Sequence, residues 1–91
     1  MIKSFSHKGL SELFETGRTR RVRQDLKSRC LRRLEALDQA EVLNDLNLPG
    51  FNFHGLHGAP KRCSIYVNGP WCITFEWKDG EALQVDLEQY H

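Results

Sequence analysis

The first half of the chain places apolar residues at helical spacing. Over residues 19–40 they recur every three or four positions with no intervening glycine or proline, which predicts an amphipathic helix of about five turns. Residues 8–16, which are followed by Gly17, predict a shorter first helix. A further helical turn is expected over residues 39–46, before the loop at Pro49-Gly50. We expect the two helices to be antiparallel.

In the second half of the chain the hydrophobic period changes to two. Residues 63–67, 71–77 and 83–87 alternate between apolar and polar side chains, as half-buried strands do, and residues 51–56 predict a further strand. Asn68-Gly69 and Asp79-Gly80 are dipeptides that tight hairpin turns prefer. The order of elements predicts an α+β fold, with the two helices and the extra helical turn packed on one face of an antiparallel sheet of about four strands.

Alternation also predicts which side of the sheet stays open. The apolar residues that should face the helices are Ile65, Val67, Ile73, Phe75, Val85 and Leu87. The middle strand then presents Cys72, Thr74 and Glu76 on the other side, and Lys61-Arg62 enter from the preceding loop. A domain of this size has little core to spare for an internal ligand cavity. We therefore expect the functional residues on the surface.

Length and composition are those of one small globular domain spanning residues 1–91. Of the 91 residues, 40% are hydrophobic and 27% are charged, and separate cores form only in much longer chains. No apolar run approaches the roughly 20 residues that cross a bilayer, and the N-terminus lacks the apolar stretch of a signal peptide. We expect a cytoplasmic protein that does not contact a membrane.

Positive charge is concentrated in one segment, although the net charge is only +1. Residues 18–33 hold eight Lys or Arg against the single Asp25, and the rest of the chain is acidic on balance. Such a segment favours contact with a polyanion, and it is equally typical of the solvated side of an amphipathic helix. The candidate contacts to nucleic acid are Arg18, Arg20, Arg21, Arg23 and Lys27.

The cysteines and histidines do not indicate a metal site. The three cysteines are odd in number and form no Cys-x-x-Cys pair, which argues against a disulfide framework and against structural zinc. The four histidines include no His-x-x-x-His pair, and His54 and His57 would point to opposite faces of a straight strand. We expect reduced thiols and neither a metal nor another cofactor.

Several landmarks occur in a characteristic order along the chain. They are the opening Met1-Ile2-Lys3-Ser4-Phe5, the stretch 50–58 with His54 and Gly58, the run Ser64-Ile65-Tyr66-Val67-Asn68, the strand Trp71-x-Ile73-Thr74-Phe75, Asp79-Gly80 and the terminal Tyr90-His91. In this order and spacing they resemble the HigB toxins, which belong to the RelE/ParE superfamily of bacterial toxin–antitoxin systems. The resemblance covers essentially the whole chain, and it implies two N-terminal helices on a twisted antiparallel sheet.

The resemblance also implies a reaction and the residues for it. Members of the family are endoribonucleases that enter the ribosomal A site and cleave the messenger RNA there, with the 2′-hydroxyl as nucleophile and no metal. Such a reaction needs a base, an acid and positive charge at the phosphate. The family's loop histidine falls on His54 and its terminal Tyr-His on Tyr90 and His91. Together with His57, these are the candidate catalytic residues.

Three positions depart from the family pattern. The family's lysine falls on His57, its strand arginine on Cys72, and its aspartate before the terminal Tyr-His on Gln89. Imidazole can exchange a proton near neutral pH, so His57 is a workable substitute. A neutral thiol has neither the charge nor the fork of donors that an arginine offers a phosphate, and an amide does not ionise. The candidate phosphate-binding positions are Lys61, Arg62, Cys72 and Gln89, with Lys61 and Arg62 as the cations available to compensate.

The sequence leaves three functions open. The first is a ribosome-dependent messenger-RNA endonuclease that inhibits translation. The second, motivated by Cys72 and Gln89, is an attenuated toxin-fold protein that serves mainly as antitoxin partner and co-repressor. The third, poisoning of DNA gyrase, rests on superfamily analogy and is disfavoured by His54 and Tyr90-His91.

The resemblance also implies a partner. The expected partner is a HigA-like antitoxin with a helix-turn-helix domain, so that this chain meets operator DNA only through the complex. We expect the antitoxin on the helical side, around residues 8–46.

Overall fold

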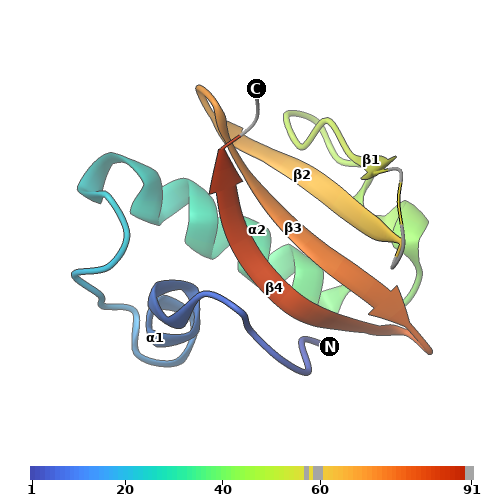
Figure 1. Ribbon diagram of the computed structural model, residues 1–91, viewed down its shortest axis with the longest axis horizontal. Helices are drawn as coiled ribbons and strands as arrows, with labels where there is room; N and C mark the ends of the chain where they lie inside the picture. Colours follow the sequence, from blue (N-terminus) through green and yellow to red (C-terminus); the bar gives the residue numbers. More distant parts are fainter. Residues whose placement is uncertain (57, 59–60, 90–91) are drawn as a thin grey trace.

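The computed structural model describes residues 1–56, 58 and 61–89 and confirms the expected α+β fold (Figure 1). Its helical elements are α1 (Lys8–Thr16), α2 (Lys27–Gln39) and the 3₁₀ turns η1 (Gln24–Leu26) and η2 (Leu43–Leu46). Its strands are β1 (His54–Leu56), β2 (Arg62–Asn68), β3 (Trp71–Lys78) and β4 (Glu81–Gln89). They form one antiparallel sheet in the order β1-β2-β3-β4. No helix in this part of the chain is long and apolar enough to span a bilayer.

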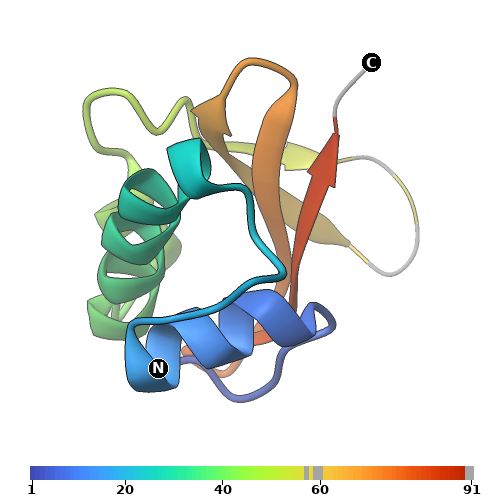
Figure 2. The same ribbon diagram turned by 90° about the vertical axis from the view of Figure 1, so that its left-hand side faces the viewer.

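The first helix begins and ends as the sequence predicts. Its last turn closes at Gly17, whose N–H donates to the carbonyl of Leu13 at 2.8 Å. Gly17 has a φ of 78°, a left-handed conformation that glycine adopts without strain. The two helices cross instead of running antiparallel as expected: Figure 1 shows α1 nearly end-on and α2 across the view, and Figure 2 shows α1 lengthwise.

The long helix is shorter than its hydrophobic pattern predicts, because residues 18–23 are not helical. The hydroxyl of Thr19 accepts the backbone N–H of Arg21 at 3.0 Å and donates to Glu12 at 2.7 Å. A threonine that bonds to its neighbouring backbone offers the chain an alternative to the helix. Val22 is nevertheless buried in the core. The helical spacing of apolar residues therefore continues into the segment before α2, although that segment is not a helix.

The core lies between the helices and one face of the sheet. Leu10 and Leu13 of α1 and Cys30, Leu34 and Leu37 of α2 pack there against Ile65, Val67, Ile73, Phe75, Ala82 and Val85. In β4 the alternation is interrupted: Glu76 pairs with Leu83 and Trp77 with Ala82, with a register shift between Thr74 and Glu76. Gln84 has a φ of 53° within this irregularity. Ala82 is therefore buried with the core, whereas Leu83 shares the face of Glu76.

The first strand is also shorter than expected. The N–H of Phe51 donates to the carbonyl of Leu48 at 3.1 Å, and Asn52 has a φ of 46°. A turn followed by a left-handed residue prevents an extended strand over residues 51–53. Pairing begins only at His54, which is opposite Ser64.

The N-terminal segment covers part of the outer edge of β4. Ile2 and Phe5 form parallel bridges to Ala82 and Val85. The N–H of Lys3 donates to the carbonyl of Ala82 at 2.7 Å, and the N–H of Ala82 donates to the carbonyl of Met1 at 2.9 Å. This segment thus satisfies backbone groups that an edge strand would otherwise expose.

Arg33 is the one Lys or Arg of residues 18–33 that is buried, and it fastens α2 to the sheet. Its side chain is 5% exposed. It donates to the backbone carbonyls of Tyr66, Arg29 and Gly50, and its guanidinium lies 4.8 Å from the ring centroid of Phe51. Burial lowers the pKa of this guanidinium. Arg33 is therefore a structural cation and is not available to a polyanion.

Candidate active site

The face of the sheet that points away from the helices carries polar side chains from all four strands. Because residues paired across strands share a face, the register places two rows of side chains there. One row is His54, Ser64, Thr74 and Asp86, and the other is Tyr66, Cys72 and Glu88. Arg62 and Leu56 pair at the start of β2 on the same side. This is the open surface that the alternation predicted, and we call it the open face.

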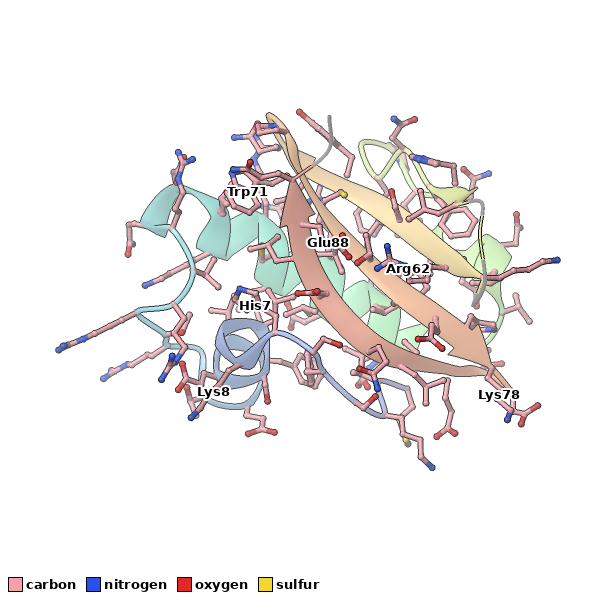
Figure 3. All side chains as sticks on the ribbon, viewed as in Figure 1. His7, Lys8, Arg62, Trp71, Lys78 and Glu88 are labelled. Carbon is pink, nitrogen blue, oxygen red and sulfur yellow. The ribbon has the colours of Figure 1, made fainter. Side chains whose placement is uncertain are left out.

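Arg62, Thr74 and Glu88 form a hydrogen-bonded network across the middle of the open face. Arg62 Nη1 and Thr74 Oγ1 both donate to Glu88 Oε1 at 2.6 Å, and Arg62 Nη1 lies 3.4 Å from Thr74 Oγ1. Figure 3 shows the Arg62 and Glu88 side chains reaching toward one another in front of β3. The two side chains cover Thr74, which is 1% exposed although it faces away from the helices.

This network fixes both charges. Hydrogen bonds from Thr74 and Arg62 lower the pKa of the Glu88 carboxyl, and the bond to Glu88 raises the pKa of Arg62. The side chains of Arg62 and Glu88 remain 37% and 36% exposed. The guanidinium is therefore charged, anchored and accessible. Arg62 is the first residue of β2, not part of the preceding loop as the sequence suggested.

His54 lies at the edge of the open face in an orientation that defines its tautomer. Its Nδ1 is 3.0 Å from the carbonyl oxygen of Asn52. Since a carbonyl only accepts, Nδ1 carries the proton of this bond, and the lone pair of the neutral ring is on Nε2. A pocket of about 310 Å³ adjoins the ring. It is lined by Asn52, His54, Ser64, Tyr66, Gly69, Pro70, Trp71 and Cys72.

Cys72 lies on the open face but brings no charge to it. The residue is 3% exposed, and burial raises the pKa of its thiol. The thiol donates weakly to the carbonyl of Glu88, with 3.7 Å between sulfur and oxygen. Cys72 thus contacts the backbone of the residue whose side chain holds Arg62.

The structure brings some predicted site residues together and separates others. His54, Arg62 and Cys72 share the open face, and Lys61 is exposed directly before β2. Gln89 pairs with Trp71 at the end of β4. That register places Gln89 on the side of Trp71, opposite to Glu88. Its part in binding a phosphate stays a prediction. His57, Tyr90 and His91 lie outside the described residues.

Four of the five predicted nucleic-acid contacts lie in a loop, and only Lys27 lies in a helix. Arg18, Arg20, Arg21 and Arg23 lie between α1 and η1, and Lys27 begins α2. Arg23 pairs with Asp25 at 2.8 Å and Arg21 with Glu12 at 3.5 Å. In Figure 1 this light-blue connection lies beyond α1 at the left, whereas the open face is turned to the viewer. We call residues 18–27 the basic connection.

Two residues of the site were missed by sequence reasoning. Glu88 is a polar position of the last alternating run, and Thr74 was expected on the open face without a role. The signal was the alternation itself, which puts Thr74 on the open face and, continued to residue 88, puts Glu88 there too, without showing that either touches Arg62. Within the described part of the chain, no group of three or more His, Cys, Asp or Glu residues is arranged to hold a metal ion.

Comparison with known proteins shows the family. Residues 3–91 match the family described as RelE-like toxin of type II toxin-antitoxin system HigB. The chain is 41% identical to the Endoribonuclease HigB of Proteus vulgaris over 92 residues, which cover all of both chains. It is 34% identical to Toxin HigB-1 of Vibrio cholerae serotype O1 over 93 residues, which cover 99% of this chain and 98% of the relative. The resemblance drawn from the sequence is thereby confirmed, and the chain belongs to the HigB-like toxins of type II toxin–antitoxin systems.

Proposed function

We propose that this chain is the toxin of a type II toxin–antitoxin system and an endoribonuclease that cleaves messenger RNA in the A site of the translating ribosome. Its relative from Proteus vulgaris is named an endoribonuclease. The observation that carries the proposal is that the open face holds an oriented histidine, His54, and an anchored cation, Arg62, on one accessible surface. Cleavage of the message would stop translation.

The reaction needs no group beyond protein side chains. Nε2 of His54 accepts the proton of the 2′-hydroxyl, and the 2′-oxygen attacks the adjacent phosphorus. The bond from phosphorus to the 5′-oxygen breaks, which leaves a 2′,3′-cyclic phosphate and a 5′-hydroxyl. The leaving oxygen takes a proton from a general acid, for which the candidates are His57, Tyr90 and His91. Arg62 stabilises the negative charge that develops on the phosphate oxygens.

Arg62 takes the part that an arginine at position 72 would play. Cys72 is buried and neutral, so it cannot stabilise a phosphate. Arg62 reaches over β3 to Glu88, the residue whose backbone Cys72 contacts, and so brings positive charge to the same part of the open face. Lys61, the exposed residue directly before the strand, is a second source of charge.

The pocket beside His54 is suited to a nucleotide of the message. Tyr66 is 38% exposed next to it. Single-stranded RNA is commonly held by stacking of its bases on aromatic side chains. The basic connection, which lies beyond α1 at the lateral end of the molecule (Figure 1), supplies a separate contact. We assign this contact to ribosomal RNA through Arg18, Arg20, Arg21, Arg23 and Lys27.

A toxin of this class has a cognate antitoxin. We infer a HigA-like partner with a helix-turn-helix domain that carries the complex to operator DNA. The helical side is our candidate docking surface, because the substrate would occupy the open face. The toxin itself acts in the cytoplasm, where its substrate is.

A second candidate function follows from Cys72 and Gln89. Cys72 brings no charge and the amide of Gln89 does not ionise, so the chain lacks the charges of the arginine and the aspartate that the family pattern has at these two positions. It would then act mainly as an antitoxin partner and co-repressor. Growth arrest by the unaltered chain contradicts this second function.

The experiment that tests the proposal is expression of this chain alone in a bacterial host, with mapping of messenger-RNA 5′ ends. We expect cuts inside translated codons that disappear when translation initiation is blocked. An uncut set of transcripts with normal growth would contradict the nuclease and favour the second function.

A further inference from the structure

In the part of the chain that the structure describes, Arg62 is anchored through one nitrogen. Its bonds to Glu88 and to Thr74 both involve Nη1. Among the described residues, Nε and Nη2 have no partner. A guanidinium presents its donors in a rigid planar fork, so an anchor at Nη1 fixes the plane while the edge formed by Nε and Nη2 remains able to bind two oxygens of one phosphate.

Glu88 is itself held in place by a buried group. Thr74 lies in the centre of the sheet, and its hydroxyl donates to the same oxygen of Glu88 that receives Arg62. This hydroxyl orients the carboxylate, and the carboxylate orients the guanidinium. An ordinary surface ion pair lacks such a fixed third member and is worth little because both side chains stay mobile.

Arg62 approaches the phosphate site from farther away than an arginine at position 72 would. An arginine at position 72 would start from the middle strand, directly beneath the phosphate site proposed above. Arg62 starts from the neighbouring strand and crosses β3 to reach Glu88 on the next. A long, flexible side chain that reaches across a strand needs a partner at its far end to keep one conformation.

We propose that Glu88 is a positioning residue, which with Thr74 holds Arg62 in the orientation that binds the phosphate undergoing cleavage. The inference rests on the proposed endoribonuclease function. Glu88 itself does not contact the RNA in this proposal. Its negative charge is offset by Arg62, and its contribution is to fix the guanidinium before the substrate arrives.

The first test measures cleavage of a messenger RNA on programmed ribosomes by the purified chain, with the single-turnover rate and the half-saturating concentration determined separately. We expect Glu88→Gln to lower the rate about tenfold, the effect of losing a hydrogen bond to a charged group, and to leave the half-saturating concentration unchanged. Glu81→Gln is the matched control, because it breaks the exposed Lys3–Glu81 pair of 3.8 Å on the same strand. A rate for Glu88→Gln equal to or above that of the unaltered chain would overturn the proposal.

The second test asks whether Glu88 acts through Arg62. Arg62→Gln should lower the rate about a hundredfold, and adding Glu88→Gln to it should change nothing further. Thr74→Val should reproduce the loss seen in Glu88→Gln, whereas Thr74→Ser, which keeps the hydroxyl, should restore the rate. Losses that multiply in the double variant would show that Glu88 acts independently and would overturn the proposal.

A third measurement separates this inference from the function on which it rests. If programmed ribosomes leave the message intact, the proposed function fails, and the positioning is tested by NMR of the arginine Nε–H groups in the full chain. The buried Nε–H of Arg33 is rigid in every variant. We expect a further rigid Nε–H, assigned to Arg62 by its absence in Arg62→Gln, that shifts on addition of inorganic phosphate at constant ionic strength and becomes mobile in Glu88→Gln. An Arg62 Nε–H that stays rigid in Glu88→Gln, or that does not shift with phosphate in the unaltered chain, would overturn the inference.

Discussion

The guanidinium of Arg33 in α2 donates to the backbone carbonyl of Tyr66 in β2. This bond runs from the helical layer to the strand that carries Tyr66 and Arg62 on its opposite face. The same guanidinium holds the carbonyl of Gly50 and covers the ring of Phe51. The core cation therefore fixes both the strand of the open face and the loop that leads to His54.

Loss of this cation should destabilise the fold. We expect Arg33→Met to lower the free energy of unfolding by about 2–4 kcal/mol, because buried carbonyls lose their donor and a cation–π contact is removed. Arg32→Met is the control, since Arg32 is an exposed neighbour and should change stability by less than about 0.5 kcal/mol. Chemical denaturation measures both variants, and equal stability of the two would contradict the structural role of Arg33.

Tyr66 should bind the message through its ring and not through its hydroxyl. Tyr66→Ala is expected to weaken binding of the substrate complex by about 1–3 kcal/mol, the range for a base stacked on an aromatic side chain. Tyr66→Phe should keep the affinity of the unaltered chain. The half-saturating concentration of chain on programmed ribosomes gives the result, and an unchanged value for Tyr66→Ala would exclude a stacking role.

The basic connection should contribute salt-dependent affinity for the ribosome. We expect the double variant with Arg18 and Arg20 replaced by glutamate to bind ribosomes more weakly. Its affinity should also depend less on salt concentration, because binding releases fewer counterions when phosphate contacts are lost. Lys78→Glu, an exposed reversal at the end of β3, is the comparison variant. Sedimentation with ribosomes over a series of salt concentrations provides the measurement. Identical salt dependence in all three chains would refute this contact.

The Arg62–Glu88 pair should give a defined pH dependence. Because Thr74 and Arg62 lower the folded-state pKa of Glu88, the stability from the pair is present above the unfolded-state pKa. It is lost as the pH falls through the lower folded-state pKa. NMR titration of the Glu88 carboxyl should therefore show a pKa that rises in Arg62→Gln. The contribution to stability is small, less than about 1 kcal/mol, because both side chains are partly exposed. A carboxyl that titrates alike in both chains would contradict the pair.

The sequence was sufficient to predict the architecture. Apolar residues recur every three to four positions in the helices and every second position in the strands because one side of each element is buried, and the core contains residues from both kinds of element. It was insufficient where a local interaction opposes the pattern. Thr19 bonds to the backbone of Arg21, and the expected helix begins only at Lys27, although Val22 keeps the apolar spacing. The left-handed Gln84 shifts the alternation of β4, so Ala82 is buried in place of Leu83.

For the site, the sequence placed residues on a face but did not show which of them are in contact. Alternation put Thr74 on the open face, and the family resemblance selected His54. The contact of Arg62 with Glu88 spans three strands and 26 residues of sequence, and depends on register and side-chain reach. Arg33 shows the converse, since its charge suggested the surface while its stem and guanidinium are buried.

The most direct test of the account is cleavage of a defined messenger RNA by the purified chain on programmed ribosomes, compared with His54→Ala, Arg62→Gln and the exchange variant Arg62→Gln with Cys72→Arg. We predict ribosome-dependent cuts in the A-site codon with cyclic phosphate and 5′-hydroxyl ends, loss of cleavage in both single variants, and recovery in the exchange variant. Undiminished cleavage by His54→Ala and Arg62→Gln would contradict the assignment of catalysis to the open face.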